Sequence, residues 1–154
     1  MSGHIVSRLQ ALGIVLPTPA APAANYVPYV LSRGMLYISG QIPVGPGGLE
    51  FVGVLGAELG IEDGRAAARL CAINILAQAQ AALGDLDRVE RVVKLTGFVN
   101  SAPGFGDQPK VVNGASDFIV EVFGEKGRHA RSAVGVAGLP FGVGVEVEAI
   151  LEVA

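Results

Sequence analysis

Residues Ile61–Leu83 read IEDGRAAARLCAINILAQAQAAL and form the clearest predicted helix of the chain. The acidic pair Glu62 and Asp63 suits the positive end of a helix dipole, alanine fills much of the interior, and Gly84 follows as a terminator. Small alanine side chains permit a close approach to other backbone. This stretch therefore predicts a long helix packed against a sheet.

Predicted strands surround this helix in the sequence. Elsewhere the hydrophobic spacing predicts a short helix at 5–12, strands at 26–31, 35–39, 89–100, 130–136 and 144–153, and a helix at 112–123. Residues 45–48 are expected to form a loop and 18–24 a linker of proline and alanine, while Val92 and Leu95 are expected on opposite faces of their strand. The order predicts an α+β fold, in which one mixed sheet carries two helices on one face. The other face is then open to partner subunits.

The composition fits one domain that associates with other copies. At 154 residues the chain has the usual size of a single domain, with an N-terminal arm and linker over 1–25 and a core over 26–154. Hydrophobic residues make up 51% and charged residues only 16%, against about 25% in ordinary soluble domains. A small chain so poor in charge is expected to bury part of its surface in an obligate oligomer.

Charge and reactive residues argue against several classes of function. The net charge is -3 and no basic tail is present, so nucleic acid is not expected as a partner. Cys71 is the only cysteine and the two histidines, His4 and His129, are far apart, so we expect no disulfide, no metal and no cofactor. No apolar run is long enough to predict a membrane span, and the lone thiol fits the cytoplasm.

Two charged residues in the last strands are candidates for chemistry. Arg131 lies in the otherwise apolar stretch 129–136, and Glu146 lies where aliphatic residues alternate with glutamates. The planar fork of a guanidinium matches the two oxygens of a small carboxylate, and a carboxylate nearby could position or deprotonate water. The alternative is a structural ion pair between Arg131 and Glu146 at a sheet edge. Spacing alone leaves both open.

Five short motifs follow one another along the chain. They are Ser39-Gly40-Gln41-Ile42-Pro43, Leu86-Asp87, Ala130-Arg131-Ser132, Leu139-Pro140 and Val145-Glu146-Val147-Glu148-Ala149-Ile150. In this order and spacing they resemble the RidA/YjgF family of reactive-intermediate deaminases, also called endoribonuclease L-PSP, over residues 26–154. The resemblance implies a chorismate-mutase-like fold and a homotrimer whose sheets form a central β-barrel, with ligand sites in clefts between subunits.

The same resemblance implies roles for individual residues. Arg131 matches the arginine that grips the substrate carboxylate, and Glu146 matches the carboxylate that helps to place the attacking water. The implied substrate-binding residues are Tyr29, Gly40, Asn113 and Ala133. Ala133 stands where many deaminases of the family carry a cysteine, which leaves only its backbone amide. From the residues alone, Tyr29 also reads as a half-buried aromatic and Asn113 as an N-cap of the second helix.

The implied activity is the hydrolysis of small enamine or imine acids, such as 2-aminoacrylate, to 2-oxo acids and ammonia. Imines hydrolyse unaided, so a fixed carboxylate and a presented water suffice for a useful acceleration. The alternative is a protein of the same fold that binds small carboxylates such as 2-oxo acids without turnover. Both place the site between chains, and Val147 is expected on an outward aliphatic face, where an introduced aspartate would separate the copies. His129 is expected on the same strand face as Arg131, as a further donor.

Overall fold

The computed structural model describes residues 3–19 and 24–154, so the predicted linker at 18–24 lies partly outside the described residues. Its helices and strands are α1 (His4–Ala11), β1 (Tyr29–Ser32), β2 (Met35–Gln41), β3 (Val44–Gly45), β4 (Gly48–Leu49), α2 (Ile61–Leu83), β5 (Val89–Asn100), α3 (Gln108–Phe123), β6 (Ala130–Val136) and β7 (Val145–Val153). Short 3-10 helices lie at Leu86–Arg88, Gly124–Gly127 and Pro140–Gly142. The predicted α+β class is confirmed.

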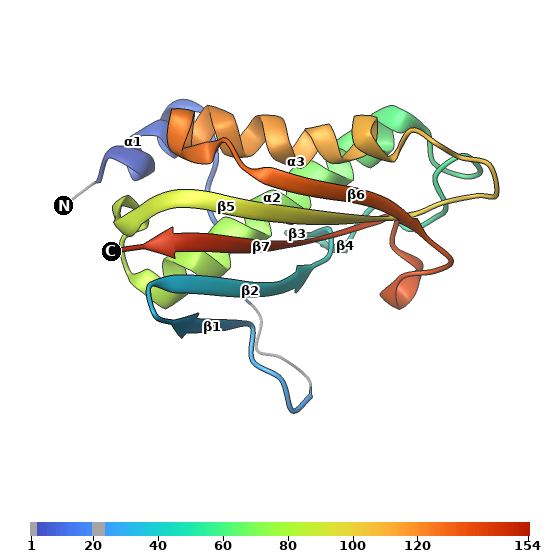
Figure 1. Cartoon of the computed structure of the whole chain (residues 1–154). Coiled ribbons are helices and arrows are strands. Elements are labelled where there is room, and N and C mark those ends of the chain that lie inside the picture. Colours follow the sequence, from blue (N-terminus) through green and yellow to red (C-terminus); the bar gives the residue numbers. More distant parts are fainter. Residues whose placement is uncertain (1–2, 20–23) are drawn as a thin grey trace.

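A mixed sheet organises the fold, in the strand order β1-β2-β7-β5-β6 (Figure 1). Neighbouring strands are antiparallel except β5 and β6, which run parallel because α3 connects them. Helices α2 and α3 both lie on one face, with α2 packed on β2 and β7 and α3 on β5 and β6. This is the predicted arrangement, and it makes β1 and β6 the two edges of the sheet.

Glycines allow α3 to lie close to its neighbours. A Cβ added at Gly114 in α3 would overlap the backbone carbonyl of Arg65 in α2, so only glycine fits at this helix crossing. A Cβ added at Gly97 in β5 would lie 2.5 Å from Cγ2 of Val112. These two close approaches fix the height of α3 above the sheet, and one flank of the helix comes to lie beside β6.

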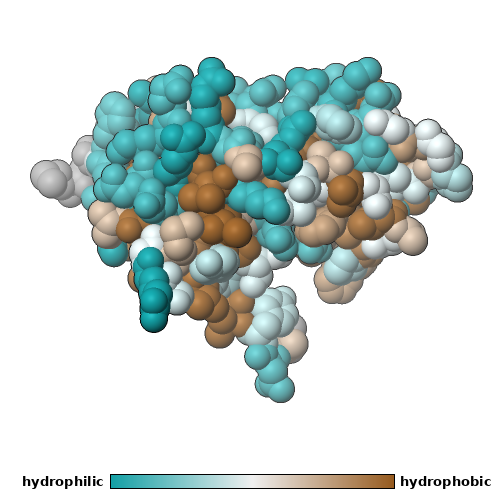
Figure 2. Space-filling model, in the orientation of Figure 1, coloured by the Kyte–Doolittle hydropathy of each residue, from teal (hydrophilic) through white to brown (hydrophobic). Residues whose placement is uncertain are grey.

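The second face of the sheet is left uncovered by the part of the chain that the structure describes. Side chains along β7 alternate between the faces: Val147 is fully buried under the helices, whereas Glu146 and Glu148 point to the open side. The prediction that Val147 faces outward is therefore wrong, because alternation separates two faces without telling which one the helices cover. Val30 and Tyr37 lie on the open face and are about half exposed. Figure 2 shows hydrophobic side chains gathered over the sheet, below the hydrophilic surface of α1 and α3.

Three local predictions are corrected by the structure. The first strand begins at Tyr29, three residues later than predicted, and residues 45–48 belong to the small β3-β4 hairpin rather than to an open loop. Val92 is fully buried on the same side as Leu95, because the register of β5 against β7 shifts between Val92 and Lys94. Such a bulge inserts one residue and reverses the alternation beyond it.

An acidic side chain fastens α1 to the rest of the molecule. The carboxylate of Asp87 accepts hydrogen bonds from the backbone N–H groups of His4, at 2.7 Å, and Ile5, at 2.8 Å. The bond from Ile5, and then that from His4, lower the pKa of Asp87. Ile5 and Leu9 are buried against the core. The arm helix is thus capped by a residue more than eighty positions away in the sequence.

By length and composition alone, α2 is long and apolar enough to match a membrane span. In the structure, 56% of its apolar window is buried inside the fold. Cys71 and Ile75 are fully buried, which confirms Cys71 as a core residue. Helix α2 is therefore the core helix of a soluble globular fold.

Candidate functional site

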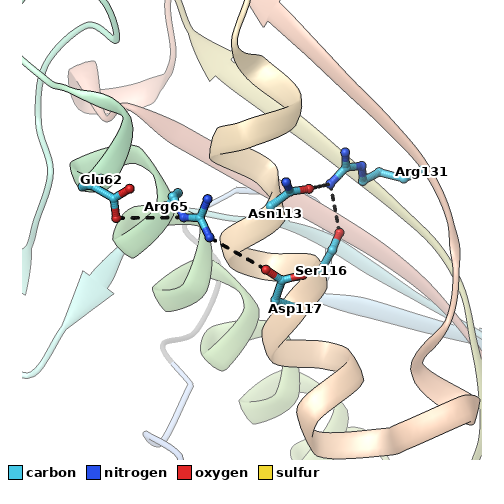
Figure 3. Close-up of polar contacts among 6 residues, drawn as sticks. All are labelled: Glu62, Arg65, Asn113, Ser116, Asp117 and Arg131. Atoms are coloured by element: carbon cyan, nitrogen blue, oxygen red, sulfur yellow. Dashed lines mark hydrogen bonds and ion pairs between the residues drawn. The ribbon is translucent and has the colours of Figure 1, made fainter.

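Arg131 is held at one edge of the sheet by α3 (Figure 3). Its Nη1 donates to Oδ1 of Asn113 at 2.8 Å and to Oγ of Ser116 at 3.2 Å, and both acceptors are neutral. Among the described residues, no carboxylate lies within ion-pair distance of Arg131, and its Nε and Nη2 form no hydrogen bond. The guanidinium is thus partly buried and fixed in direction, with its charge and one edge free to meet an anion.

His129 lies beside this arginine and shares Ser116 with it. Its Nδ1 lies 2.6 Å from the backbone carbonyl oxygen of Gly127, and its Nε2 lies 2.8 Å from Oγ of Ser116. The expected placement of His129 and Arg131 on one side of the strand is confirmed, because both reach the same serine of α3. Four polar side chains, from β6, α3 and the residue before β6, therefore meet at this edge.

Glu146 and Gly40 form a second group, on the other side of the sheet. Gly40 lies in β2 next to a register shift, and a Cβ added there would overlap the carboxylate of Glu146. Burial, and then the negative charge of Glu148, raise the pKa of Glu146. A carboxylate whose pKa is raised is closer to the range in which it exchanges protons at neutral pH.

Arg131 and Glu146 lie on opposite faces of the sheet. Arg131 is in register with Leu95, which is fully buried under the helices, whereas Glu146 is in register with Phe98. Leu95 and Phe98 are three positions apart in one strand, so their side chains point to opposite faces. The alternative of an ion pair between Arg131 and Glu146 within one chain is therefore wrong.

The remaining predicted residues are divided between the two edges. Ala133 lies in β6 two residues beyond Arg131 and packs partly buried against the core. Asn113 lies inside α3, whose N-cap is Asp107, so the reading of Asn113 as an N-cap is wrong. Tyr29 lies in β1 at the opposite edge, where it packs against the core as a half-buried aromatic. Four strand spacings, roughly 19 Å, separate β1 from β6, so one chain does not bring Tyr29 to Arg131.

Ser116 is the residue of this site that the sequence analysis missed. It contacts both Arg131 and His129, which are separated from it by 15 and 13 positions in the sequence. One signal was available, because Asn113 and Ser116 are three residues apart within the predicted helix and so share one face. What the sequence does not show is that this face lies over β6.

The groups around Arg131 suit a small organic acid. They combine a guanidinium, an amide, a hydroxyl and an imidazole within one edge of the molecule. Across the parts of the chain that the structure describes, no group of three or more His, Cys, Asp or Glu residues is placed to hold a metal ion.

Comparisons with known proteins give the family. The family described as "YjgF/chorismate_mutase-like, putative endoribonuclease" matches residues 6–147. Protein TCP17 of Trypanosoma cruzi is 59% identical over 152 residues, which cover 98% of this chain and 95% of that protein. Solved relatives carry names such as "putative endoribonuclease" and "putative translation initiation inhibitor".

Solved structures agree with this assignment. The crystal structure of the protein Atu1372 of Agrobacterium tumefaciens, described as of unknown function, is 50% identical with a TM-score of 0.92, over 97% of this chain and 92% of that chain. The crystal structure of E. coli TdcF with bound serine is 29% identical with a TM-score of 0.64, over 89% and 94% of the two chains. The chain therefore belongs to the YjgF/RidA family, with its chorismate-mutase-like α+β fold.

Proposed function

We propose that the chain hydrolyses small reactive enamine or imine acids, of the 2-aminoacrylate type, to 2-oxo acids and ammonia in the cytoplasm. The observation that carries this proposal is the environment of Arg131, whose charge is offset by no carboxylate within residues 3–19 and 24–154 and whose direction is fixed by neutral groups of α3. A guanidinium edge of this kind favours a carboxylate ligand. TdcF of E. coli, whose crystal structure holds serine, binds a molecule with such a carboxylate.

In this proposal the complete site lies between copies of the chain. Arg131 and Tyr29 lie at opposite edges of the sheet and Glu146 lies on its open face, so a second copy supplies the missing groups. The uncovered face, with Val30 and Tyr37 about half exposed, offers apolar surface for association. A homotrimer buries this face and brings the β1 edge of one copy to the β6 edge of the next.

The reaction needs orientation more than strong activation. Arg131 holds the carboxylate of the substrate, and a water adds to the carbon of the C=N bond. Glu146 of a neighbouring copy orients that water by accepting its hydrogen bond, and Gly40 leaves its carboxylate unobstructed. The backbone amide of Ala133 lines the same cleft. Collapse of the adduct releases ammonia and leaves a 2-oxo acid.

Cleavage of RNA, which the family description names, is disfavoured by the charges of this chain. Its net charge is -3, and the open face carries Glu146 and Glu148. A surface that binds the phosphate backbone instead gathers lysine and arginine. We therefore place a small carboxylate, not nucleic acid, in the cleft.

The test is the rate of ammonia release from 2-aminoacrylate or 2-iminobutanoate generated enzymatically in the assay. The wild type is expected to accelerate release, and Arg131→Ala to lose about 100-fold in kcat/KM, because the substrate loses its charged anchor. Arg65→Ala is the matched control and is expected to act like the wild type. No acceleration by the wild type refutes the deaminase. If a 2-oxo acid still raises the melting temperature of the wild type but not of Arg131→Ala, the non-catalytic binding protein replaces it.

The shared cleft has a separate test on the open face. Val30→Asp puts a charge on a half-exposed position, so the fold should survive while the copies separate. Val147→Asp is unsuitable for this purpose because Val147 is fully buried within one chain. Sedimentation is expected to show a trimer for the wild type and a monomer without activity for Val30→Asp. A monomer that keeps full activity would exclude a site built from two copies.

A further inference from the structure

Ser116 and His129 form a hydrogen-bonded pair whose direction can be read from their partners. The backbone carbonyl of Gly127, 2.6 Å from Nδ1 of His129, can only accept, so Nδ1 carries the proton of the neutral ring. Nε2 is then an acceptor, and the Ser116 hydroxyl, 2.8 Å away, donates to it. Oγ of Ser116 accepts in turn from Nη1 of Arg131 at 3.2 Å. The three side chains form one directed chain of hydrogen bonds from the guanidinium to the imidazole.

We propose that Ser116 and His129 are a proton-relay pair for the acid held by Arg131, with Ser116 as the catalytic hydroxyl and His129 as the proton acceptor behind it. This inference rests on the proposed deaminase function and adds two residues to it. A hydroxyl joined to a neutral imidazole is the usual arrangement by which an enzyme activates a weak oxygen acid. The positive charge of Arg131 beside Oγ favours the build-up of negative charge on that oxygen.

This pair lies beside the arginine that holds the acid, at its Nη1, next to the free edge formed by Nε and Nη2. In a 2-imino acid the carbon of the C=N bond is attached directly to the carboxylate, so the arginine that clasps the carboxylate also fixes the reacting carbon near itself. Ser116 is within hydrogen-bond distance of that arginine, whereas Glu146 of the same chain points to the opposite face of the sheet. Asp117, the next residue of α3, points to α2, where it pairs with Arg65 at 3.9 Å (Figure 3). Of the residues that the structure describes, Ser116 and His129 are thus the candidate proton-accepting groups beside Arg131.

The proton transfers balance through one turnover. The oxygen of a water forms a bond to the imine carbon, and the π electrons of the C=N bond move to nitrogen. The proton of the water passes to Oγ of Ser116 while the proton of Ser116 passes to Nε2 of His129. The imidazolium then returns that proton, through Ser116, to the nitrogen of the adduct. The proton of the adduct's hydroxyl then follows the same route, through Ser116 and His129, to the amino nitrogen. The C–N bond breaks as the C=O bond forms, and ammonia and the 2-oxo acid leave.

The experiment separates proton transfer from simple support of Arg131. Kinetics of ammonia release are measured for Ser116→Ala, Ser116→Thr, His129→Ala, His129→Gln and Asn113→Ala, each checked for folding by its melting temperature. Ser116→Ala, His129→Ala and His129→Gln are expected to lower kcat about 100-fold with little change in KM. Ser116→Thr, which keeps a hydroxyl, is expected to recover most of that kcat. Asn113→Ala, which removes only a support of Arg131, is expected to raise KM instead.

Rescue by free imidazole distinguishes proton transfer by His129 from a purely structural role. Free imidazole is expected to restore part of the kcat of His129→Ala, but to leave Ser116→Ala and the wild type unchanged. Ser7→Ala, an exposed helical serine of α1, is the control and should match the wild type. An active wild type whose kcat survives the loss of His129, or a His129→Ala variant that imidazole does not rescue, overturns the relay and leaves the deaminase standing. A wild type that releases no ammonia overturns both.

Discussion

Arg65 and Arg131 lie on the two flanks of α3, and their partners differ in charge (Figure 3). Arg65, in α2, lies 4.0 Å from Oε2 of Glu62 and 3.9 Å from Oδ2 of Asp117, so two carboxylates offset its charge. Arg131, in β6, is held by an amide oxygen and a hydroxyl. Asp117 and Ser116 are neighbours in α3, and the step of about 100° between them sends their side chains to opposite flanks.

This difference separates an arginine that joins two helices from one that is available to a ligand. Arg65 is partly exposed, so its ion pairs add little to stability. The two carboxylates also offset the charge that it would otherwise present to a ligand. Arg131 keeps its charge, and the neutral groups that hold it reduce the freedom that it would lose on binding an anion. The charge of the partners, rather than the presence of an arginine, therefore marks the candidate site.

The largest expected effect comes from forcing α3 away from α2, on the flank where Arg65 lies. Gly114→Ala places a Cβ against the backbone carbonyl of Arg65, and backbone cannot move aside as a flexible side chain can. We expect a loss of about 3 kcal/mol in unfolding free energy, or roughly 6 to 12 °C in melting temperature. Gly106→Ala is the control, because no atom lies within 4 Å of its added Cβ. Equal melting temperatures for the two variants would contradict the close packing of α2 on α3.

The next effect comes from making Arg131 resemble Arg65. Asn113→Asp keeps the shape of the side chain but turns the neutral acceptor of Arg131 into a carboxylate, which offsets the charge that a ligand needs. We expect the affinity for a 2-oxo acid, measured by titration calorimetry, to fall about 30-fold, which corresponds to about 2 kcal/mol. Asn113→Ala removes the acceptor without adding charge and should weaken binding less. Undiminished affinity in Asn113→Asp would show that Arg131 is not the anchor.

Much of the fold could be predicted from the sequence, because its strongest patterns are local. The helix Ile61–Leu83 and the strands Val89–Asn100 and Ala130–Val136 have the predicted bounds. Gly84 ends its helix in the left-handed conformation that glycine tolerates, at φ 76°. Local patterns also separated the two faces of β7. They did not reveal which face the helices cover, and so the prediction for Val147 was wrong.

The site was less predictable, because it depends on register and on how elements cross. Arg131 and Glu146 were both singled out, but the face of each one follows from its pairing with β5, which the spacing does not contain. Val92 was misplaced because a bulge shifts that same strand. Ser116 was missed because its partners come from β6 and the residue before it, which reach α3 only in the folded chain.

The smallest expected effect is a pH-dependent change in stability on substitution of Glu146. It tests whether this carboxylate forms an ion pair with Arg131. An ion pair with Arg131 would lower the pKa of Glu146, whereas burial, and then Glu148, raise it. A carboxyl whose pKa is higher in the folded than in the unfolded state lowers stability above that folded pKa. As pH falls through the raised value toward the ordinary 4.5, this cost disappears.

Glu146→Gln is therefore expected to be slightly more stable than the wild type at pH 7, by less than about 1 kcal/mol after screening by solvent. The advantage should vanish as the pH is lowered toward 4.5, the ordinary pKa of the group. Urea unfolding at several pH values measures this difference in stability. The control is Glu152→Gln, at an exposed glutamate near the end of β7, and it should show no such trend. A Glu146→Gln variant that is less stable at pH 7, with the deficit shrinking in acid, would instead place Glu146 in an ion pair and return Arg131 to the same class as Arg65.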